Sequence, residues 1–413
     1  MPRVYFVETS DGVFIQATDA PSPIAEEGIY TQLVEERVRE AASAFAVPDF
    51  VFDPLKVSKG GAVREVTDAL IIASDLALSV QVKARDPLAA SGDADKEGRW
   101  IKKHAAKGVR QAEGSLRAMI KTGGGRFVNR LGREVDISFD RLIVCNVVVI
   151  DHPDPPKVLL EVPEAKNPTL ILLRYEWEFL IAQLRSVHGL HRYVHGVALL
   201  PAVPLGDELA RFNEQVIVAG GLWSSGSANP DTQVPLVDPT LPLIRMGESL
   251  PTCEEFWRNL YLSLSECRFK PEHEWVRLET MARFDRLPFS MREEIANHLT
   301  SRLRGTGSQL DFFVVQEGSS HTQFVFGVTE VHPSESAPRF EALTHLQHGM
   351  QPLAESGGVR ETIGIMFYGV PQREPAFTIT VVPLAGPSNL TPTQAAELAR
   401  FCGVGQATPL WPK

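Results

Sequence analysis

The chain has 413 residues, a formal net charge of −10 and 44% apolar residues, so it is long enough for two globular domains rather than one. The apolar fraction, with 22% charged residues, excludes a disordered chain and a fibrous repeat. The longest strongly apolar run, residues 142–150, is far shorter than the roughly 20 residues that cross a bilayer, so no membrane partner is expected.

The cysteines and the first residues indicate where the protein works. The four cysteines have no paired spacing, which argues against a disulfide framework and against a thiolate zinc site. Residues 1–18 alternate polar and apolar positions and lack the basic head and apolar middle of a signal peptide. We therefore expect a cytoplasmic protein with reduced thiols.

The N-terminal elements are predicted from local patterns. Two short β-prone runs flank Asp11-Gly12, a common turn dipeptide, and predict a β-hairpin. From Glu26 to Phe45, apolar residues recur at steps of three and four, which predicts an amphipathic helix. After a loop around residues 56–61, two adjacent strands are predicted at 69–73 and 76–84, joined by a turn.

A second, strongly basic helix is predicted from near Arg99 to the glycines at 123–125. One face is apolar and the opposite face is largely cationic. Between Lys96 and Arg133 there are eleven Lys and Arg and two Glu, so this segment carries +9 and the rest of the chain −19. Such a stripe is commonly a solvated helix face, but it also has the charge needed to follow a phosphate backbone.

The remaining elements divide the chain into two parts. A buried strand at 142–150, a strand at 169–173 and a helix at 175–187 complete an α/β unit. Residues 219–252 are rich in Pro and Gly without a sustained period, which indicates a connecting segment. Beyond it, helices near 255–266 and 291–304 precede strands at 312–315, 323–328, 362–367 and 377–382. We therefore predict an α/β domain over 1–200, a connecting segment over 201–254, and an α+β domain over 255–413.

The most informative polar residues lie on the predicted pair of strands. Gln81 and Lys83 are two residues apart, so they share one face of their strand while Val80 and Val82 pack on the other. A buried lysine is costly unless it is paired. Asp68, at the start of the neighbouring strand, is placed to pair with Lys83.

This order of Asp, hairpin and Gln-x-Lys resembles the PD-(D/E)XK nuclease superfamily, in particular its restriction-endonuclease-like branch in which Gln replaces the second acid. The resemblance covers roughly residues 26–150, where helix, two strands and basic helix also follow the family's order. It implies a restriction-endonuclease-like mixed sheet flanked by helices. It also implies a metal-dependent nuclease of bacterial type, acting on DNA more than RNA, which serves defence against foreign DNA or DNA repair, with defence slightly favoured.

The resemblance assigns roles to individual residues. Asp68 and Gln81 would bind Mg²⁺ or Mn²⁺ through oxygen atoms, and Lys83 would position the attacking water and stabilise the developing charge. Family members often take a further acid from the first helix, which implies Glu36. Further candidates for this acid are Glu35, Glu40 and, on the strand lead-in, Glu65.

The basic helix has its own implied role. On the resemblance, its cationic face would bind nucleic acid, and one glutamine would point toward the site as in some relatives. The residues concerned are Lys102, Lys103, Lys107, Arg110, Gln111 and Arg117.

Two departures from the family pattern leave a second interpretation open. Thr67 stands where the family has Pro, and Gln81 is a neutral metal ligand that binds Mg²⁺ more weakly than a carboxylate. The alternative is a catalytically inactive nuclease-like fold that acts as a protein-interaction module. In either case the C-terminal domain is expected to bind a protein partner, a second copy of the chain, or substrate.

Other motifs give no stronger site. His191 and His195 are four residues apart, but no acidic or thiolate residue accompanies them at ligand spacing, so they are read as ordinary histidines rather than zinc ligands. The glycines at 123–125 lack the order of a phosphate-binding loop. No GxSxG motif is present.

Overall fold

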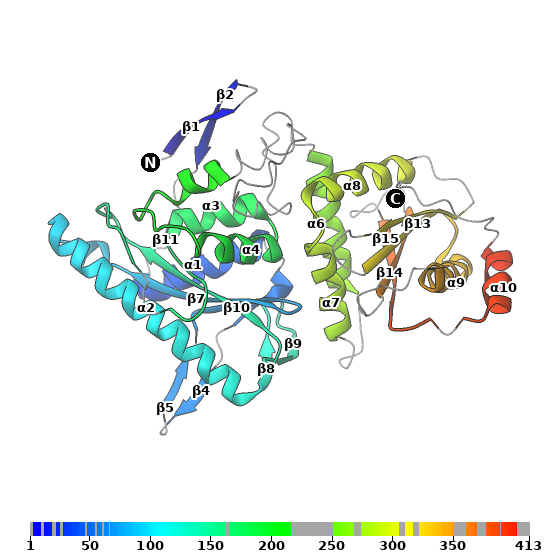
Figure 1. The fold of residues 1–413 in the computed structure, drawn as a ribbon, viewed down its shortest axis with the longest axis horizontal. Coiled ribbons are helices and arrows are strands. Elements are labelled where there is room, and N and C mark those ends of the chain that lie inside the picture. The colour runs from blue at the N-terminus through cyan, green and yellow to red at the C-terminus, as the bar shows by residue number, and fades with distance from the viewer. Residues whose placement is uncertain are drawn as a thin grey trace, which may run out of the picture. The chain divides into compact units, whose positions relative to one another are not determined.

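The computed structural model describes residues 3–9, 12–18, 22–24, 28–45, 48–53, 56–59, 62–65, 67–161, 165–215, 251–267, 274–304, 310–316, 322–350, 361–369, 377–388 and 390–402. The chain divides into two compact units, Met1–Gly247 and Glu248–Lys413, which are described separately (Figure 1). No helix among the described residues is both long enough and apolar enough to span a membrane.

A five-stranded mixed sheet forms the centre of the first unit. Its strands lie in the order β11-β10-β7-β6-β3. Strands β3, β6 and β7 pair antiparallel, whereas β7, β10 and β11 pair parallel. Their bounds are β3 Val51–Phe52, β6 Ala69–Ala73, β7 Leu76–Ala84, β10 Ile143–Asp151 and β11 Thr169–Leu173. The predicted strands and the tight turn at Ser74-Asp75 are therefore confirmed.

Helices cover both faces of this sheet (Figure 1). On one face, Val148 and Ile150 of β10 pack against α2 (Ala94–Thr122). On the other face, Cys145 of β10 contacts His191 of α4 (Val187–Val197). Helices α1 (Tyr30–Phe45) and α3 (Arg174–Leu184) lie on that second side. They contact each other through the Trp177 indole N–H, which donates a hydrogen bond to Val38 O at 3.1 Å. The first unit is thus α/β, with a mixed sheet flanked by helices.

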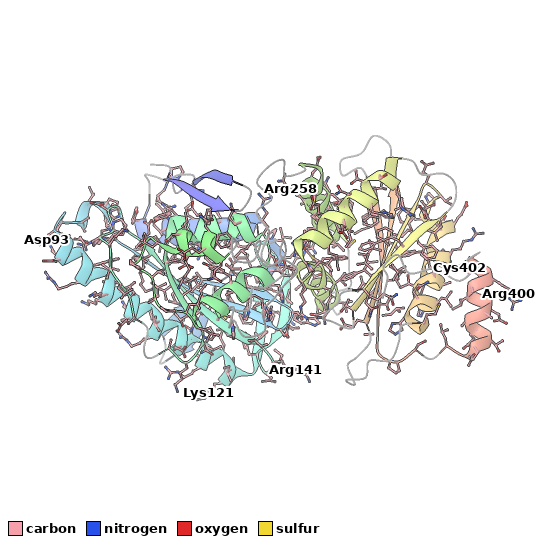
Figure 2. The ribbon with its side chains drawn as sticks, turned by 45° about the horizontal axis from the view of Figure 1, so that its top comes forward. Asp93, Lys121, Arg141, Arg258, Arg400 and Cys402 are labelled. Carbon is pink, nitrogen blue, oxygen red and sulfur yellow. The ribbon has the colours of Figure 1, made fainter. Side chains whose placement is uncertain are left out.

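Helix α2 is longer than the sequence pattern predicted. It begins at Ala94 rather than near Arg99, because the Asp93 carboxylate accepts hydrogen bonds from the main-chain N–H of Asp95 and Lys96 and caps the helix. It ends at Gly123, which has a φ of 73°. Figure 2 shows Asp93 and Lys121 near its two ends.

Helix α2 also lies very close to the sheet. A Cβ added at Gly108 would come within 2.6 Å of Val148 Cγ1. Glycine at this position therefore allows the backbone of α2 to approach β10 closely.

Three small hairpins accompany the central sheet. The predicted N-terminal hairpin is confirmed as β1 (Arg3–Thr9) and β2 (Gly12–Thr18), with its turn residues 10–11 outside the described residues. The loop expected around 56–61 instead contains strands β4 (Lys56–Lys59) and β5 (Ala62–Glu65), which pair antiparallel. Strands β8 (Gly124–Val128) and β9 (Glu134–Ser138), which follow α2, were not predicted.

Part of the expected connecting segment folds with the first unit. Residues 208–215 are helical. Phe212 is fully buried, and its ring lies 5.6 Å from that of Phe179 and 5.5 Å from that of Tyr193. Compact structure therefore continues at least to residue 215, and residues 216–250 lie outside the described part of the chain.

The second unit contains a four-stranded sheet in the order β12-β13-β14-β15. Strands β13 and β14 pair parallel because helix α9 connects them, and the outer pairs are antiparallel. Aromatic rings fill much of its core, including Phe326, whose ring centroid lies 5.1 Å from that of Phe313. The elements are α6 Pro251–Glu266, α7 Glu274–Asp285, α8 Phe289–Arg304, β12 Asp311–Gln316, β13 Thr322–Thr329, α9 Pro333–Met350, β14 Glu361–Gly369, β15 Phe377–Ala385 and α10 Pro392–Cys402.

Candidate functional site

Strand register decides which way the polar residues of β7 face. Gln81 pairs with Val148 of β10, and Lys83 pairs with Ile150. Residues paired in register share a face of a sheet, and Val148 and Ile150 pack on α2. Gln81 and Lys83 therefore share one face of β7, as their spacing predicted, and this is the face that α2 covers.

Asp68 lies beside these residues, in the turn that leads into β6. Continuing the β6–β7 register by one step from the Ala69–Val80 pair puts Asp68 opposite Gln81. Its Oδ2 accepts a hydrogen bond from Val82 N at 2.6 Å, and Lys83 Nζ lies 3.8 Å from the same oxygen. The side chains of Lys83 and Asp68 are 12% and 18% exposed, and Gln81 is 3% exposed. The structure thus brings Asp68 and Lys83 into contact in a mostly buried site.

The electrostatics of Lys83 identify further neighbours. Burial lowers its pKa, and this outweighs the charges of Asp68 and Glu35, which raise it. The charge of Lys107 lowers it as well. Glu35 belongs to α1 and Lys107 to α2, so the two helices contribute charges of opposite sign to the surroundings of Lys83.

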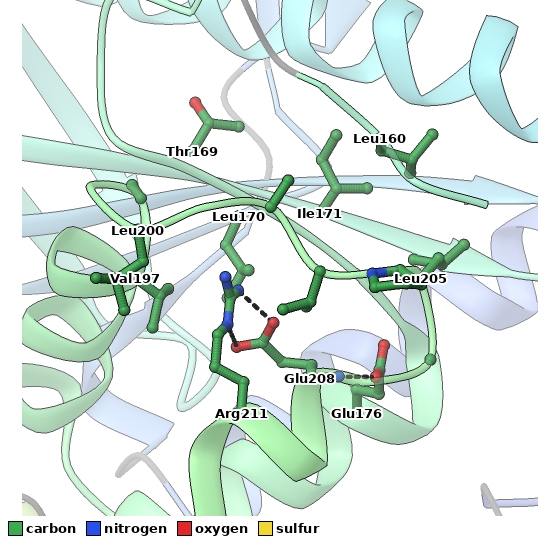
Figure 3. A pocket seen from close by; sticks show the side chains of 15 residues that line it. Leu160, Thr169, Leu170, Ile171, Glu176, Val197, Leu200, Leu205, Glu208 and Arg211 are labelled. Carbon is green, nitrogen blue, oxygen red and sulfur yellow. Dashed lines mark hydrogen bonds and ion pairs between the residues drawn. The ribbon is translucent and has the colours of Figure 1, made fainter. Parts of the chain in front are cut away.

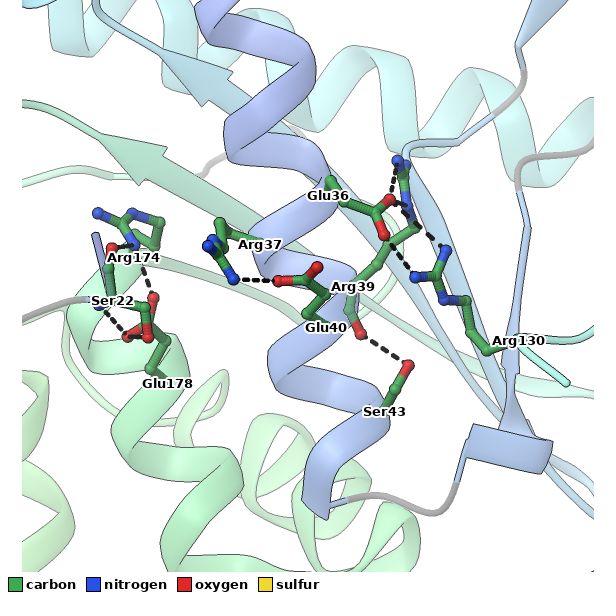
Figure 4. Close-up of polar contacts among 9 residues, drawn as sticks. All are labelled: Ser22, Glu36, Arg37, Arg39, Glu40, Ser43, Arg130, Arg174 and Glu178. Atoms are coloured by element: carbon green, nitrogen blue, oxygen red, sulfur yellow. Dashed lines mark hydrogen bonds and ion pairs between the residues drawn. The ribbon is translucent and has the colours of Figure 1, made fainter. Parts of the chain in front are cut away.

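Glu36, expected to complete a metal site, has other partners. Its carboxylate accepts hydrogen bonds from Arg39 Nη2 at 2.8 Å and from Arg39 Nε at 3.1 Å, and it pairs with Arg130 (Figure 4). Burial acts to raise the pKa of Glu36, but the hydrogen bonds and charges of the two arginines outweigh it and lower the pKa. Glu36 is therefore an ionised partner of two cations.

The other acidic candidates differ in their surroundings. Glu40 pairs with Arg37 on the same helix, and the side chain of Glu65 lies outside the described residues. Glu35 is the α1 carboxylate whose charge acts on Lys83. Glu36 was the expected acid, with Glu35, Glu40 and Glu65 as further candidates, and of these it is Glu35 whose charge raises the pKa of Lys83.

The predicted nucleic-acid-binding residues lie on the solvent side of α2. All six are exposed. Within the part of the chain that the structure describes, none of their five cations forms an ion pair within 4 Å. These residues are Lys102, Lys103, Lys107, Arg110, Gln111 and Arg117. The helix therefore presents positive charge to solvent next to the Asp68–Lys83 pair.

His104 and Trp100 border the same site and were not predicted to. Their rings stack with centroids 4.2 Å apart, one turn before Lys107 on α2. Burial lowers the pKa of His104, and the charges of Lys107, Lys103, Lys83 and Arg85 lower it further. The spacing of Trp100, His104 and Lys107 at steps of four and three is the sequence signal that places them on one helix edge.

The oxygen donors at this site suit a hard divalent cation. Mg²⁺ prefers carboxylate and amide oxygens and usually keeps several waters, and Asp68 and Gln81 supply oxygens of these kinds. Among the described residues, no three Asp, Glu, His or Cys side chains form a metal-binding cluster. A metal ion here would therefore draw on the Gln81 amide as well as on carboxylates.

The histidines considered for zinc lie apart from this site. His191 is buried, with Nε2 2.9 Å from Ile143 O and 3.4 Å from Cys145 Sγ. His195 is exposed. The two rings therefore differ in their surroundings.

A pocket of about 170 Å³ lies elsewhere in the first unit, between β11, the end of α4 and residues 200–211 (Figure 3). Its buried charged groups all have partners within the protein. Arg211 Nε donates to Glu208 Oε1 at 3.2 Å, and Glu176 accepts hydrogen bonds from the main-chain N–H of Leu173 and Glu208. Strand β10 separates β11 from β7, so this pocket is distinct from the Asp68–Lys83 site.

Comparisons of the chain with protein-family models, with curated proteins and with solved structures found no match. The candidate site is therefore defined by its own geometry. That geometry consists of the Asp68–Lys83 contact, the common face of Gln81 and Lys83, and the exposed cations of α2.

Proposed function

We propose that the first unit is a metal-dependent nuclease with a restriction-endonuclease-like fold of the PD-(D/E)XK type, which hydrolyses phosphodiester bonds of DNA. The observation that carries the proposal is the 3.8 Å contact between Lys83 Nζ and Asp68 Oδ2, next to Gln81 on the face of β7 that α2 covers. The antiparallel β6–β7 pair, extended by parallel β10, supports it further. Defence against foreign DNA is the biological role that we propose for this activity.

The residues of the site have distinct parts in the proposed reaction. Asp68 and Gln81 would hold Mg²⁺ or Mn²⁺, with Glu35, whose charge acts on Lys83, as a further carboxylate. Bound there, the metal ion would lower the pKa of water and offset charge on the scissile phosphate. The Lys83 ammonium would stabilise the negative charge that develops on the phosphate oxygens.

The exposed cations of α2 would bind the DNA backbone. A helix with unpaired Lys and Arg side chains gains affinity for DNA by releasing condensed counterions, and this contribution does not depend on sequence. The helix lies over the strand that carries Lys83. A phosphate backbone bound along α2 would therefore pass close to the proposed reactive groups.

Replacing Lys103, Lys107 and Arg110 together by Ala is expected to weaken DNA binding to a similar degree for all sequences. The slope of log affinity against log salt should become shallower by about 0.9 for each duplex phosphate that the variant no longer binds. Fluorescence anisotropy of labelled duplexes over a series of salt concentrations measures both effects. Lys157→Ala is the control, since Lys157 is 79% exposed, does not belong to α2 and pairs with Asp207. If the salt dependence of binding is unchanged in the triple variant, the cationic face of α2 is an ordinary solvated helix face.

A catalytically inactive interaction module is the second candidate function. Two features favour it. Lys83 is paired with Asp68, and Glu36 is held by Arg39 and Arg130. The negative charges of Asp68 and Glu36 are thus balanced by protein cations without a metal ion. In that case, the second unit would supply the surface for a protein partner or for a second copy of the chain.

Cleavage by the full chain separates the two functions. With Mg²⁺ or Mn²⁺, the wild-type protein is expected to cut plasmid or single-stranded DNA, and a chelator should stop the reaction. Asp68→Asn should abolish cleavage because the amide supplies a neutral ligand in place of a carboxylate. Asp140→Asn, in an exposed turn, should cut like the wild type. A wild-type protein that cuts neither DNA nor RNA with either metal would favour the interaction module.

A further inference from the structure

Helix α1 carries two Arg–Glu pairs that look alike in sequence but have different surroundings (Figure 4). Arg37 pairs with Glu40, and both side chains are exposed, by 38% and 43%. Arg39 pairs with Glu36 at the same spacing, but the Arg39 side chain is only 14% exposed. Glu36 is 37% exposed, so the two pairs differ in their arginines: Arg39 is mostly buried, whereas Arg37 lies at the surface.

The Arg39–Glu36 pair connects to Asp68 at one end. Arg39 Nη1 donates a hydrogen bond to the main-chain oxygen of Asp68 at 2.8 Å, while its Nε and Nη2 donate to Glu36. Asp68 N also donates to Val80 O at 3.1 Å, and Asp68 Oδ2 accepts from Val82 N. The peptide groups on both sides of the Asp68 Cα and its carboxylate are thus held by hydrogen bonds.

At the other end, the pair connects to the β8–β9 hairpin. Arg130 pairs with Glu36, and its Nη1 lies 3.6 Å from Asp53 Oδ1. Its own main-chain N–H donates to Val51 O at 2.9 Å, which fastens the hairpin to the edge strand β3. Glu36 is therefore held between an arginine that contacts Asp68 and an arginine whose backbone is bound to the sheet.

We propose that Arg39 is a positioning residue for Asp68, and that Glu36, anchored by Arg130, holds the Arg39 guanidinium in place. The inference rests on the proposed role of Asp68 as a metal ligand. A metal-binding carboxylate must be held close to its productive position, and partners behind the ligands orient it. Arg39 fixes the Asp68 main chain from the side of α1, where Val82 cannot reach.

Direct binding of Mn²⁺ to the full chain tests this role without requiring turnover. Arg39→Gln is expected to bind Mn²⁺ about 10-fold to 100-fold more weakly than the wild type, the usual effect of losing a partner behind a metal ligand. Arg37→Gln is the matched control, on the same helix with the same kind of partner, and should bind like the wild type. Calorimetry or the electron paramagnetic resonance signal of free Mn²⁺ gives the affinities.

A conservative variant separates positioning from a general loss of folding. Arg39→Lys keeps one donor for the Asp68 carbonyl but cannot also make the two hydrogen bonds to Glu36. Its Mn²⁺ affinity should fall between those of the wild type and Arg39→Gln, with a melting temperature close to that of the wild type. Equal affinities for Arg39→Gln and Arg37→Gln would overturn the inference and leave the proposed function intact.

Glu36 gives the second discriminating comparison. Glu36→Gln leaves the charges of Arg39 and Arg130 without their shared carboxylate, so it should also weaken Mn²⁺ binding, and added salt should reduce this loss. Loss of binding in Glu36→Gln with full binding in Arg39→Gln would make Glu36 a ligand and overturn the inference. A wild-type chain that binds no Mn²⁺ would overturn the proposed function and this inference with it.

Discussion

Replacing Lys83 by methionine is expected to reduce DNA cleavage about 10²-fold to 10³-fold, the usual effect of removing one preorganised group that stabilises charge in the transition state. Methionine keeps an apolar stem in the mostly buried position of Lys83 but removes the ammonium. DNA binding should largely survive, because the exposed cations of α2 carry it. Single-turnover cleavage and fluorescence anisotropy of the same variant measure the two effects separately.

Stability shows whether Lys83 has a catalytic or only a structural role. If Lys83 serves only to neutralise Asp68, its loss leaves a mostly buried carboxylate without its cation and should cost about 3–5 kcal/mol. If Asp68 binds a metal ion, Mg²⁺ should keep the melting temperature nearly unchanged, because the ion compensates the carboxylate. Lys157→Met, at an exposed Lys–Asp pair, is the control for both assays. Full cleavage by Lys83→Met would contradict the catalytic role.

Acidification is expected to destabilise the first unit through His191. Burial lowers the pKa of His191 to about 4 from 6.5, and the hydrogen bond to Ile143 O opposes this only in part. Its Nδ1 is buried without a hydrogen-bond partner in the described chain. Between pH 6.5 and 4 the unfolded chain binds a proton that the folded chain does not. The associated stability is therefore complete above pH 6.5 and falls by about 3 kcal/mol as the pH drops to 4.

His191→Gln removes this titration. The glutamine amide can still donate to Ile143 O, so the variant is expected to fold, with less pH dependence than the wild type. The difference in unfolding free energy between pH 7.5 and pH 4 should shrink by about 3 kcal/mol in urea denaturation of the first unit. His195→Gln changes an exposed ring and should retain the wild-type dependence. The same acid destabilisation in His191→Gln would assign it to other groups.

Some elements failed to appear in the sequence pattern for a physical reason. Helix α9 has Pro338 in its interior, and its buried residues include Phe340, Thr344 and His348, so it lacks the alternation of apolar and polar faces that marks a surface helix. Hairpin β8–β9 is held by its contact with β3, where Asp53 N donates to Val128 O at 2.9 Å. Both α9 and the β8–β9 hairpin therefore depend on contacts with distant parts of the chain rather than on a local sequence pattern.

The sequence by itself determined the features that depend on local periodicity. Gln81 and Lys83 share a face because a strand repeats every two residues, and α2 has a cationic side because a helix repeats every 3.6 residues. The turn at Ser74-Asp75 then brings Asp68 back beside them. Local periodicity and one tight turn are therefore enough to place these three residues together.

Only the tertiary structure decides which partner each carboxylate of α1 takes. Glu35 and Glu36 are neighbours in sequence, and no local pattern tells them apart. The choice depends on how α1 is rotated on the sheet and on Arg130, which is 94 residues away in the chain and binds Glu36. Contacts over such separations follow from packing rather than from periodicity, which is why Glu36 was the expected ligand and Glu35 is the carboxylate whose charge acts on Lys83.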